Sequence, residues 1–145
     1  MTILIPVDMK KNQKILKKID DNEVILLCIV DPNVLEIIAE MTTEKGWLGD
    51  KFTTSFKNTL MKQYERLLER WINNAEASLK KRNIKVESHK EKGNFKKIIT
   101  DYVKKNNPNK LVFAYKRGYN PYWEILKPVI SNLCKKLKVQ CVIET

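Results

Sequence analysis

The chain has 145 residues, of which 43% are hydrophobic and 31% charged, and its formal net charge is +11. This composition excludes a mostly disordered chain, and the length suits one domain, residues 1–145, with a full core. No apolar stretch is long enough for a membrane span or a secretion signal, so we expect a cytoplasmic protein.

The first third of the chain alternates between apolar stretches and amphipathic ones. We expect a strand at Thr2–Val7, a short helix at Lys10–Ile19 and a strand at Val24–Val30. The unbroken apolar run of the second strand is typical of a central parallel strand that is covered on both faces. Asp31-Pro32 ends this strand, because proline lacks a backbone donor.

Residues 33–51 are less regular. The sequence predicts a helical turn around Val34–Met41, followed by a loop or short flap. Gly46–Lys51 either folds over the neighbouring cleft as a lid or caps the sheet.

A long amphipathic helix is expected at Phe52–Arg82. Its apolar residues recur at steps of three or four and form one stripe, which predicts core packing rather than a row of rings for stacking nucleobases. The stripe consists of Phe52, Phe56, Leu60, Tyr64, Leu67, Trp71, Ala75 and Leu79.

The rest of the chain continues the alternation of strands and helices. The expected elements are a strand at Ile84–Ser88, a helix at Phe95–Lys105 capped by Asn94, a strand at Leu111–Ala114, a helix at Tyr122–Leu137 containing Pro128, and a strand at Val139–Ile143. This order predicts a three-layer α/β/α fold around a five-stranded parallel sheet, joined by right-handed crossovers.

The cysteines and the histidine do not form a metal-ligand pattern. Cys28, Cys134 and Cys141 are widely spaced in apolar surroundings, and the sequence holds no C-x-x-C pair. We therefore interpret all three as small core residues rather than as disulfide or metal cysteines. His89 alternates with Glu87 and Glu91 along a strand and has no neighbouring thiol, so no metal site is expected there.

The residues after the fourth strand are the most informative of the chain. Leu111–Ala114 runs directly into Tyr115, Lys116, Arg117 and Gly118. In an open α/β sheet, ligands bind in a crevice beyond the carboxyl ends of such strands. Two cations at this point can attract an anion, but a single glycine does not make a phosphate cradle.

The order of elements and several short motifs resemble the universal stress protein family. Ile3–Asp8 is similar to that family's opening strand, which ends in Pro-Val-Asp, and Cys28–Pro32 is similar to its second strand. Gly93, the helix after it and Lys110–Phe113 match the family's glycine, helix and fourth strand. The resemblance implies an adenine-nucleotide alpha-hydrolase-like fold, a role in stress response, and a homodimer built through the last strand.

ATP-binding members of the family carry the motif G-x2-G-x9-G-[ST], from which this sequence departs. Tyr115 occupies the first glycine position and Gly118 the second, while Lys127-Pro128 replaces the final Gly-Ser with a spacing one residue shorter. A side chain in place of glycine blocks close backbone approach to phosphate, and proline removes an amide donor. The resemblance therefore disfavours ATP, or another adenine nucleotide, as a cofactor bound in the usual way.

Other contacts of the family can be carried over residue by residue. Asp8 corresponds to the acidic residue that contacts the nucleoside and Val30 to the position beside the adenine, while Pro6 and Val129 are further candidates near the cleft. Simpler roles compete with these assignments: Asp8 caps the turn after its strand, and Val30 is a core residue. A magnesium site between Asp8 and Asp31 is an additional, less favoured alternative.

The leading functional hypothesis is a regulatory or stress-response module without tight ATP binding. No nucleophile elbow, P-loop or carboxylate pair supplies a catalytic residue. One alternative is a site for a nucleotide or small anion, formed by Lys116, Arg117 and Lys127.

A second alternative is a protein that binds nucleic acid or another polyanion, although the dispersed lysine doublets favour solvated faces. The expected dimer strand carries Val139, Cys141 and Ile143, and Lys138 and Glu144 would protect it in a monomer.

Overall fold

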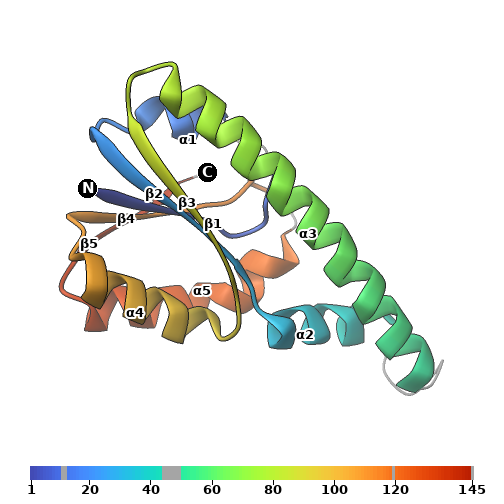
Figure 1. Cartoon of the computed structure of the whole chain (residues 1–145). Helices are drawn as coiled ribbons and strands as arrows, with labels where there is room; N and C mark the ends of the chain where they lie inside the picture. Colours follow the sequence, from blue (N-terminus) through green and yellow to red (C-terminus); the bar gives the residue numbers. More distant parts are fainter. Residues whose placement is uncertain (11–12, 44–49, 119, 145) are drawn as a thin grey trace.

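The computed structural model describes residues 1–10, 13–43, 50–118 and 120–144. Five parallel strands form one sheet in the order β3-β2-β1-β4-β5 (Figure 1). The strands are β1 (Thr2–Pro6), β2 (Glu23–Val30), β3 (Lys85–Lys92), β4 (Lys110–Ala114) and β5 (Gln140–Glu144). The strand order reverses between β1 and β4, so this pair marks the position where an open α/β sheet holds a ligand.

Helices cover both faces of the sheet, as Figure 1 shows. They are α1 (Gln13–Lys18), α2 (Pro32–Thr43), α3 (Asp50–Lys80), α4 (Phe95–Asn106) and α5 (Pro121–Lys136). One apolar core lies between the sheet and the α1/α3 layer, and a second lies between the sheet and the α4/α5 layer. The predicted three-layer α/β/α fold with a five-stranded parallel sheet is confirmed.

The segment after β2 contains a twelve-residue helix rather than a helical turn and a loop. Pro32 occupies the first helical position, where its missing amide proton costs nothing. Val34, Leu35, Ile38 and Ala39 share the buried face of α2, which explains why the helix continues to Thr43. The lid considered for Gly46–Lys51 falls mostly on residues 44–49, which lie outside the described residues.

The buried face of α3 differs from the predicted stripe in its middle. Leu67 is 41% exposed, while Leu68 and Ile72 are buried against the sheet. A stripe with 3.6 residues per turn drifts around the helix, so the core-facing positions shift by one residue over several turns. Phe52 belongs to residues 50–53 at the start of α3, whose side chains lie outside the described part of the structure.

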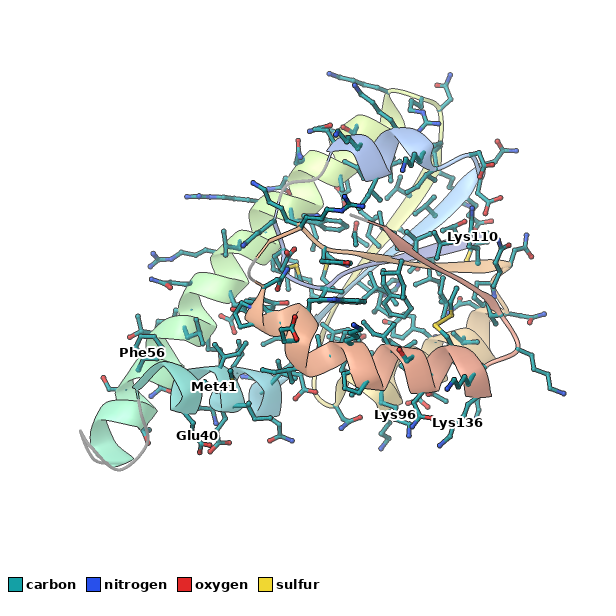
Figure 2. All side chains as sticks on the ribbon, turned by 180° about the vertical axis from the view of Figure 1, so that it is seen from behind. Glu40, Met41, Phe56, Lys96, Lys110 and Lys136 are labelled. Atoms are coloured by element: carbon teal, nitrogen blue, oxygen red, sulfur yellow. A yellow bond between two sulfur atoms is a disulfide. The ribbon has the colours of Figure 1, made fainter. Side chains whose placement is uncertain are left out.

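The interpretation of the cysteines was wrong for two of the three. Cys134 in the last turns of α5 and Cys141 in β5 form a disulfide, with their Cα atoms 5.9 Å apart (yellow bond in Figure 2). The short connection folds β5 back along α5 and brings the two thiols together, a tertiary effect that their sequence surroundings do not reveal. Cys28 is free and buried in the core, as predicted.

None of the described helices combines the length and the apolar character needed to cross a membrane.

Candidate functional site

Asp8 lies at the carboxyl end of β1 and is only 2% exposed. One of its carboxylate oxygens accepts a hydrogen bond from the amide of Lys10 at 3.1 Å. The other accepts from the amide of Lys116 at 2.9 Å and from the side-chain amide of Asn120 at 2.5 Å. Met9 adopts a left-handed backbone with φ of 58°, which turns the chain so that the amide of Lys10 reaches back to Asp8. The carboxylate thus joins β1, the segment after β4 and α5.

Asn120 also controls the start of α5. Its side-chain oxygen accepts from the amide of Trp123 at 3.1 Å, and its backbone oxygen accepts from the amide of Glu124 at 3.1 Å. The side-chain nitrogen lies 3.3 Å from the carbonyl oxygen of Lys116, in addition to its bond to Asp8. In the first turn of α5, where other α/β proteins bind an anion, the amides of Trp123 and Glu124 are therefore directed at Asn120.

Aromatic rings pack around these strand ends. Tyr115 stacks on Trp123 with ring centroids 4.1 Å apart and planes inclined by 3°. The ring centroids of Tyr64, in α3, and Tyr122 are 5.0 Å apart, and the hydroxyl of Tyr64 donates to the carbonyl of Val7 at 3.0 Å. Burial raises the pKa of Tyr64 well above its usual value and that of Tyr122 to about 12. Both hydroxyls therefore stay protonated beyond the pH at which an ordinary tyrosine ionises.

On the α4/α5 side, the space beside the end of β2 is nearly filled. A cavity bounded partly by Tyr64, Tyr122 and Phe95 has a volume of about 10 Å³, the size of a single water site. Asp31 also borders this cavity, and its carboxylate accepts from the amides of Asn33 and Phe95, each at 2.9 Å. Asp31 therefore ties the start of α2 to the start of α4. Among the described residues, no group of three or more potential metal ligands comes together.

Two larger pockets lie along α3. The first, which we call the cationic pocket, has a volume of about 520 Å³ and is lined by Met9, Lys10, Leu67, Arg70, Trp71, Asn74 and Lys116. The second, the mixed-charge pocket, has a volume of about 470 Å³ and lies between α3 and the ends of β2 and β3. Its lining holds Lys62, Arg66, Lys90 and Lys92 together with Glu65, Glu69 and Glu91.

The structure separates several residues that the sequence placed together. Lys116 lines the cationic pocket, whereas Lys127 is exposed on α5 and lines none of the pockets described above. Arg117 and Gly118 are exposed, and Gly118 has a φ of 108° with open space where a Cβ would lie.

The other candidates lie mainly in the core. Pro6 is buried and aligned with Ala114 of β4, and Val129 packs against the α4/α5 core. Val30 belongs to the α1/α3 core and also borders the mixed-charge pocket.

Sequence reasoning missed Lys10, Arg70 and Asn120 as parts of this region. Lys10 belongs to one of the dispersed lysine doublets, which predict solvated faces, and Arg70 lies near the exposed Leu67 on a face of α3 that periodicity does not mark as lining a pocket. The sequence does indicate the helix cap at Asn120, since an Asn before a Pro is a common start of a helix. It gives no sign of the hydrogen bond from Asn120 to the carboxylate of Asp8, 112 residues away.

The outer face of α4 and α5 carries part of the positive charge. Lys96 and Lys136 lie close together there, as Figure 2 shows. A side-chain hydrogen bond from Lys136 and its charge lower the pKa of Lys96. On the β3 side, by contrast, the carboxylates have partners: His89 contacts Glu87 at 2.9 Å and Tyr102 donates to Glu91 at 2.6 Å.

No family model and no curated protein matches the sequence. Solved structures that share its fold include two hypothetical proteins. The hypothetical protein MJ0577, whose biochemical function was assigned from its structure, is 18% identical with a TM-score of 0.58, covering 99% of this chain and 95% of that one. The hypothetical protein PH0823 is 17% identical with a TM-score of 0.59, covering 99% of this chain and 94% of that one. At these identities the likeness establishes the fold alone, which is the fold that the resemblance to universal stress proteins implied.

Proposed function

We propose that the chain is a non-catalytic module of the universal stress protein type that does not bind ATP in that family's usual way. The observation that carries this proposal is the environment of Asp8. Its buried carboxylate already accepts three hydrogen bonds from the chain itself, from Lys10, Lys116 and Asn120. A nucleoside that approached this carboxylate would have to displace them at a cost of about 1–3 kcal/mol for each buried group left unpaired.

The packing around the strand ends supports the same proposal. Tyr115, which replaces a motif glycine, is stacked on Trp123, and the cavity beside Tyr64 and Tyr122 holds about 10 Å³. Pro128 lies inside α5, where it supplies no amide proton. These groups leave neither a phosphate cradle nor space for a base on the α4/α5 side of the strand ends, whereas the cationic pocket and the mixed-charge pocket open on the α3 side.

A thermal-melt series tests the proposal. In the double variant Arg70→Gln/Lys116→Gln, we expect no change in melting temperature with MgATP, MgADP or AMP at 5 mM and fixed ionic strength. A ligand at a hundred times its dissociation constant would add about 2.7 kcal/mol, several degrees for a domain of this size. A saturable rise with MgATP, retained in the double variant Arg70→Gln/Lys116→Gln that discharges the cationic pocket, would contradict the closed cleft.

We further propose that the module is a homodimer paired through β5. The sheet has two edges, and β3 is the charged one, with exposed Lys85, Glu87, Lys90 and Lys92. β5 carries no charge from Gln140 to Ile143, and Ile143 is 44% exposed. Charged residues on an edge strand oppose pairing with another chain, so β5 is the better edge for a partner.

Sedimentation at micromolar concentration tests the dimer. We expect twice the chain mass for the wild type and a monomer for Ile143→Lys. The matched control is Ile37→Lys on α2, an equally exposed position at 43%, which should remain dimeric. A monomeric wild type, or equal dissociation of both variants, would contradict pairing through β5.

A further inference from the structure

We propose that the cationic pocket binds a small organic anion, with a phosphate or carboxylate group held by Lys10, Arg70 and Lys116 and an apolar body against Leu67 and Trp71. This goes beyond the function proposed above, because the pocket lies along α3, and most of its residues belong to that helix. It neither uses the carboxylate of Asp8 nor occupies the position beside Val30.

The side chains of the three cations in the cationic pocket have no carboxylate partner in its lining, although the buried Asp8 accepts from the backbone amides of Lys10 and Lys116. The lining of this pocket contains three cations and, among the described residues, no carboxylate. None of the salt bridges in the described part of the chain involves Lys10, Arg70 or Lys116. Cations that converge on one pocket repel one another unless an anion lies between them, so the site favours a negatively charged group.

The mixed-charge pocket offers an internal comparison. It is of similar volume and also lies along α3, but its cations alternate with three glutamates, and Lys90 pairs directly with Glu69. Its charge is therefore largely satisfied by the chain. The contrast shows that cations without a carboxylate partner in the lining are a property of the cationic pocket and do not follow from the net charge of the chain alone.

The apolar part of the lining sets the class of ligand. Leu67 exposes 41% of its surface, and the buried side chains of Trp71 and Met9 line the pocket with it. The volume of about 520 Å³ falls within the range of roughly 300–1,000 Å³ that small-molecule sites occupy. A bare inorganic ion would leave this apolar surface uncovered, whereas an aryl or acyl anion would bury it.

The backbone positions of the cations are fixed before a ligand arrives. The amides of Lys10 and Lys116 are both bonded to the carboxylate of Asp8, so these two lysines are held on either side of one buried group. Arg70 and Trp71 are neighbours within the long helix α3. Elements that are already ordered lower the entropic cost of forming a site.

Calorimetric titration with four probes tests this proposal: phenyl phosphate, benzoate, inorganic phosphate and benzyl alcohol. We expect saturable binding of phenyl phosphate or benzoate, and the tighter of the two identifies the anionic group. Inorganic phosphate should bind at least fivefold more weakly, because it lacks the apolar body, and benzyl alcohol should not bind. Affinity should fall as sodium chloride rises from 50 to 200 mM.

Variants locate the binding. Arg70→Gln/Lys116→Gln should weaken the best probe at least fivefold. The matched control, Lys127→Gln/Lys135→Gln, removes two exposed cations from α5 and should leave affinity unchanged. Absence of saturable binding of both aryl anions at 5 mM, equal weakening in the control, or equally tight binding of benzyl alcohol would each overturn the proposal.

Discussion

The side-chain amide of Asn120 donates a hydrogen bond of 2.5 Å to the buried carboxylate of Asp8, across 112 residues of sequence. Asp8 closely follows the first strand, and Asn120 caps the start of the last helix. The bond therefore fixes the loop after β4 against β1, at the position where the strand order of the sheet reverses. A carboxylate that the family resemblance assigned to a nucleoside serves here to hold two elements together.

Replacing Asp8 with Asn should lower the free energy of unfolding by about 3 kcal/mol. The variant keeps the size of the side chain but replaces one acceptor oxygen with an NH2 group. That group then faces the backbone amide of Lys10 or Lys116, which is also a donor, so buried polar groups are left unpaired. Urea denaturation measures the change. Asp20→Asn is the control, since that side chain is 84% exposed, and it should change stability by less than about 0.5 kcal/mol. Equal effects of the two substitutions would show that the contacts of Asp8 contribute nothing.

Asn120→Ala should cost about 1–2 kcal/mol, because it removes the cap of α5 together with the bond to Asp8. A double-mutant cycle with Asp8→Asn should give a coupling energy of at least about 0.5 kcal/mol, as expected for residues in one network. Strictly additive effects would indicate that the two side chains act independently.

Cysteine labelling should distinguish the three thiols. Under native conditions at pH 8, iodoacetamide should modify none of them, and after mild reduction it should modify Cys134 and Cys141 only. Burial raises the pKa of the Cys28 thiol to about 12, so the reactive thiolate is scarce there. Mass spectrometry of peptides identifies the modified sites. Labelling of Cys28 as fast as Cys134 in the reduced folded protein would contradict its burial.

Removing the disulfide should also lower stability. Closing the short loop between Cys134 and Cys141 stabilises the folded chain by roughly 2–3 kcal/mol in the chain-entropy model. Cys134→Ser/Cys141→Ser should therefore melt several degrees below the oxidised wild type and close to the reduced wild type. Identical melting of oxidised and reduced wild type would contradict a stabilising disulfide.

Stability should fall as the pH rises from about 10, because an unfolded tyrosine ionises there while Tyr64 and Tyr122 remain neutral in the folded state. The raised pKa of these tyrosines in the folded state thus lowers the free energy of unfolding only above the ordinary tyrosine pKa and has no effect at pH 7. Tyr64→Phe should reduce this pH dependence between pH 10 and 11, although it loses a hydrogen bond to Val7 at neutral pH. An unchanged pH dependence in the variant would mean that Tyr64 ionises freely in the folded protein.

The layer order and the existence of all five strands could be predicted from the sequence. The apolar run that begins at Val24 marks a buried strand, and the spacing of apolar residues around Ile99 marks an amphipathic helix. Prediction from the sequence failed where the outcome depended on tertiary approach. The helix Pro32–Thr43 was underestimated since its buried face is completed by α3 and α5, and Cys134 and Cys141 meet only once β5 has folded back along α5.

The candidate site could be predicted only in part, because it too depends on the tertiary approach of distant segments. Lys116 follows a strand and was recognisable as a residue of the cleft, but its neighbours Lys10 and Arg70 come from segments far away in sequence. The expected partner Lys127 lies on an exposed face of α5 instead. Helical phase alone does not reveal which face of α3 borders the end of β1.

The central claim, a strand-end cleft closed to ATP, is tested most directly by titrating the ¹⁵N-labelled protein with MgATP and following the backbone amides of Trp123 and Glu124. Both amides donate to Asn120 in the first turn of α5, where a phosphate would bind. The account predicts that their resonances stay in place up to 5 mM MgATP, in the wild type and in Arg70→Gln/Lys116→Gln. Saturable shifts of these two amides at submillimolar MgATP, present in both proteins, would contradict it.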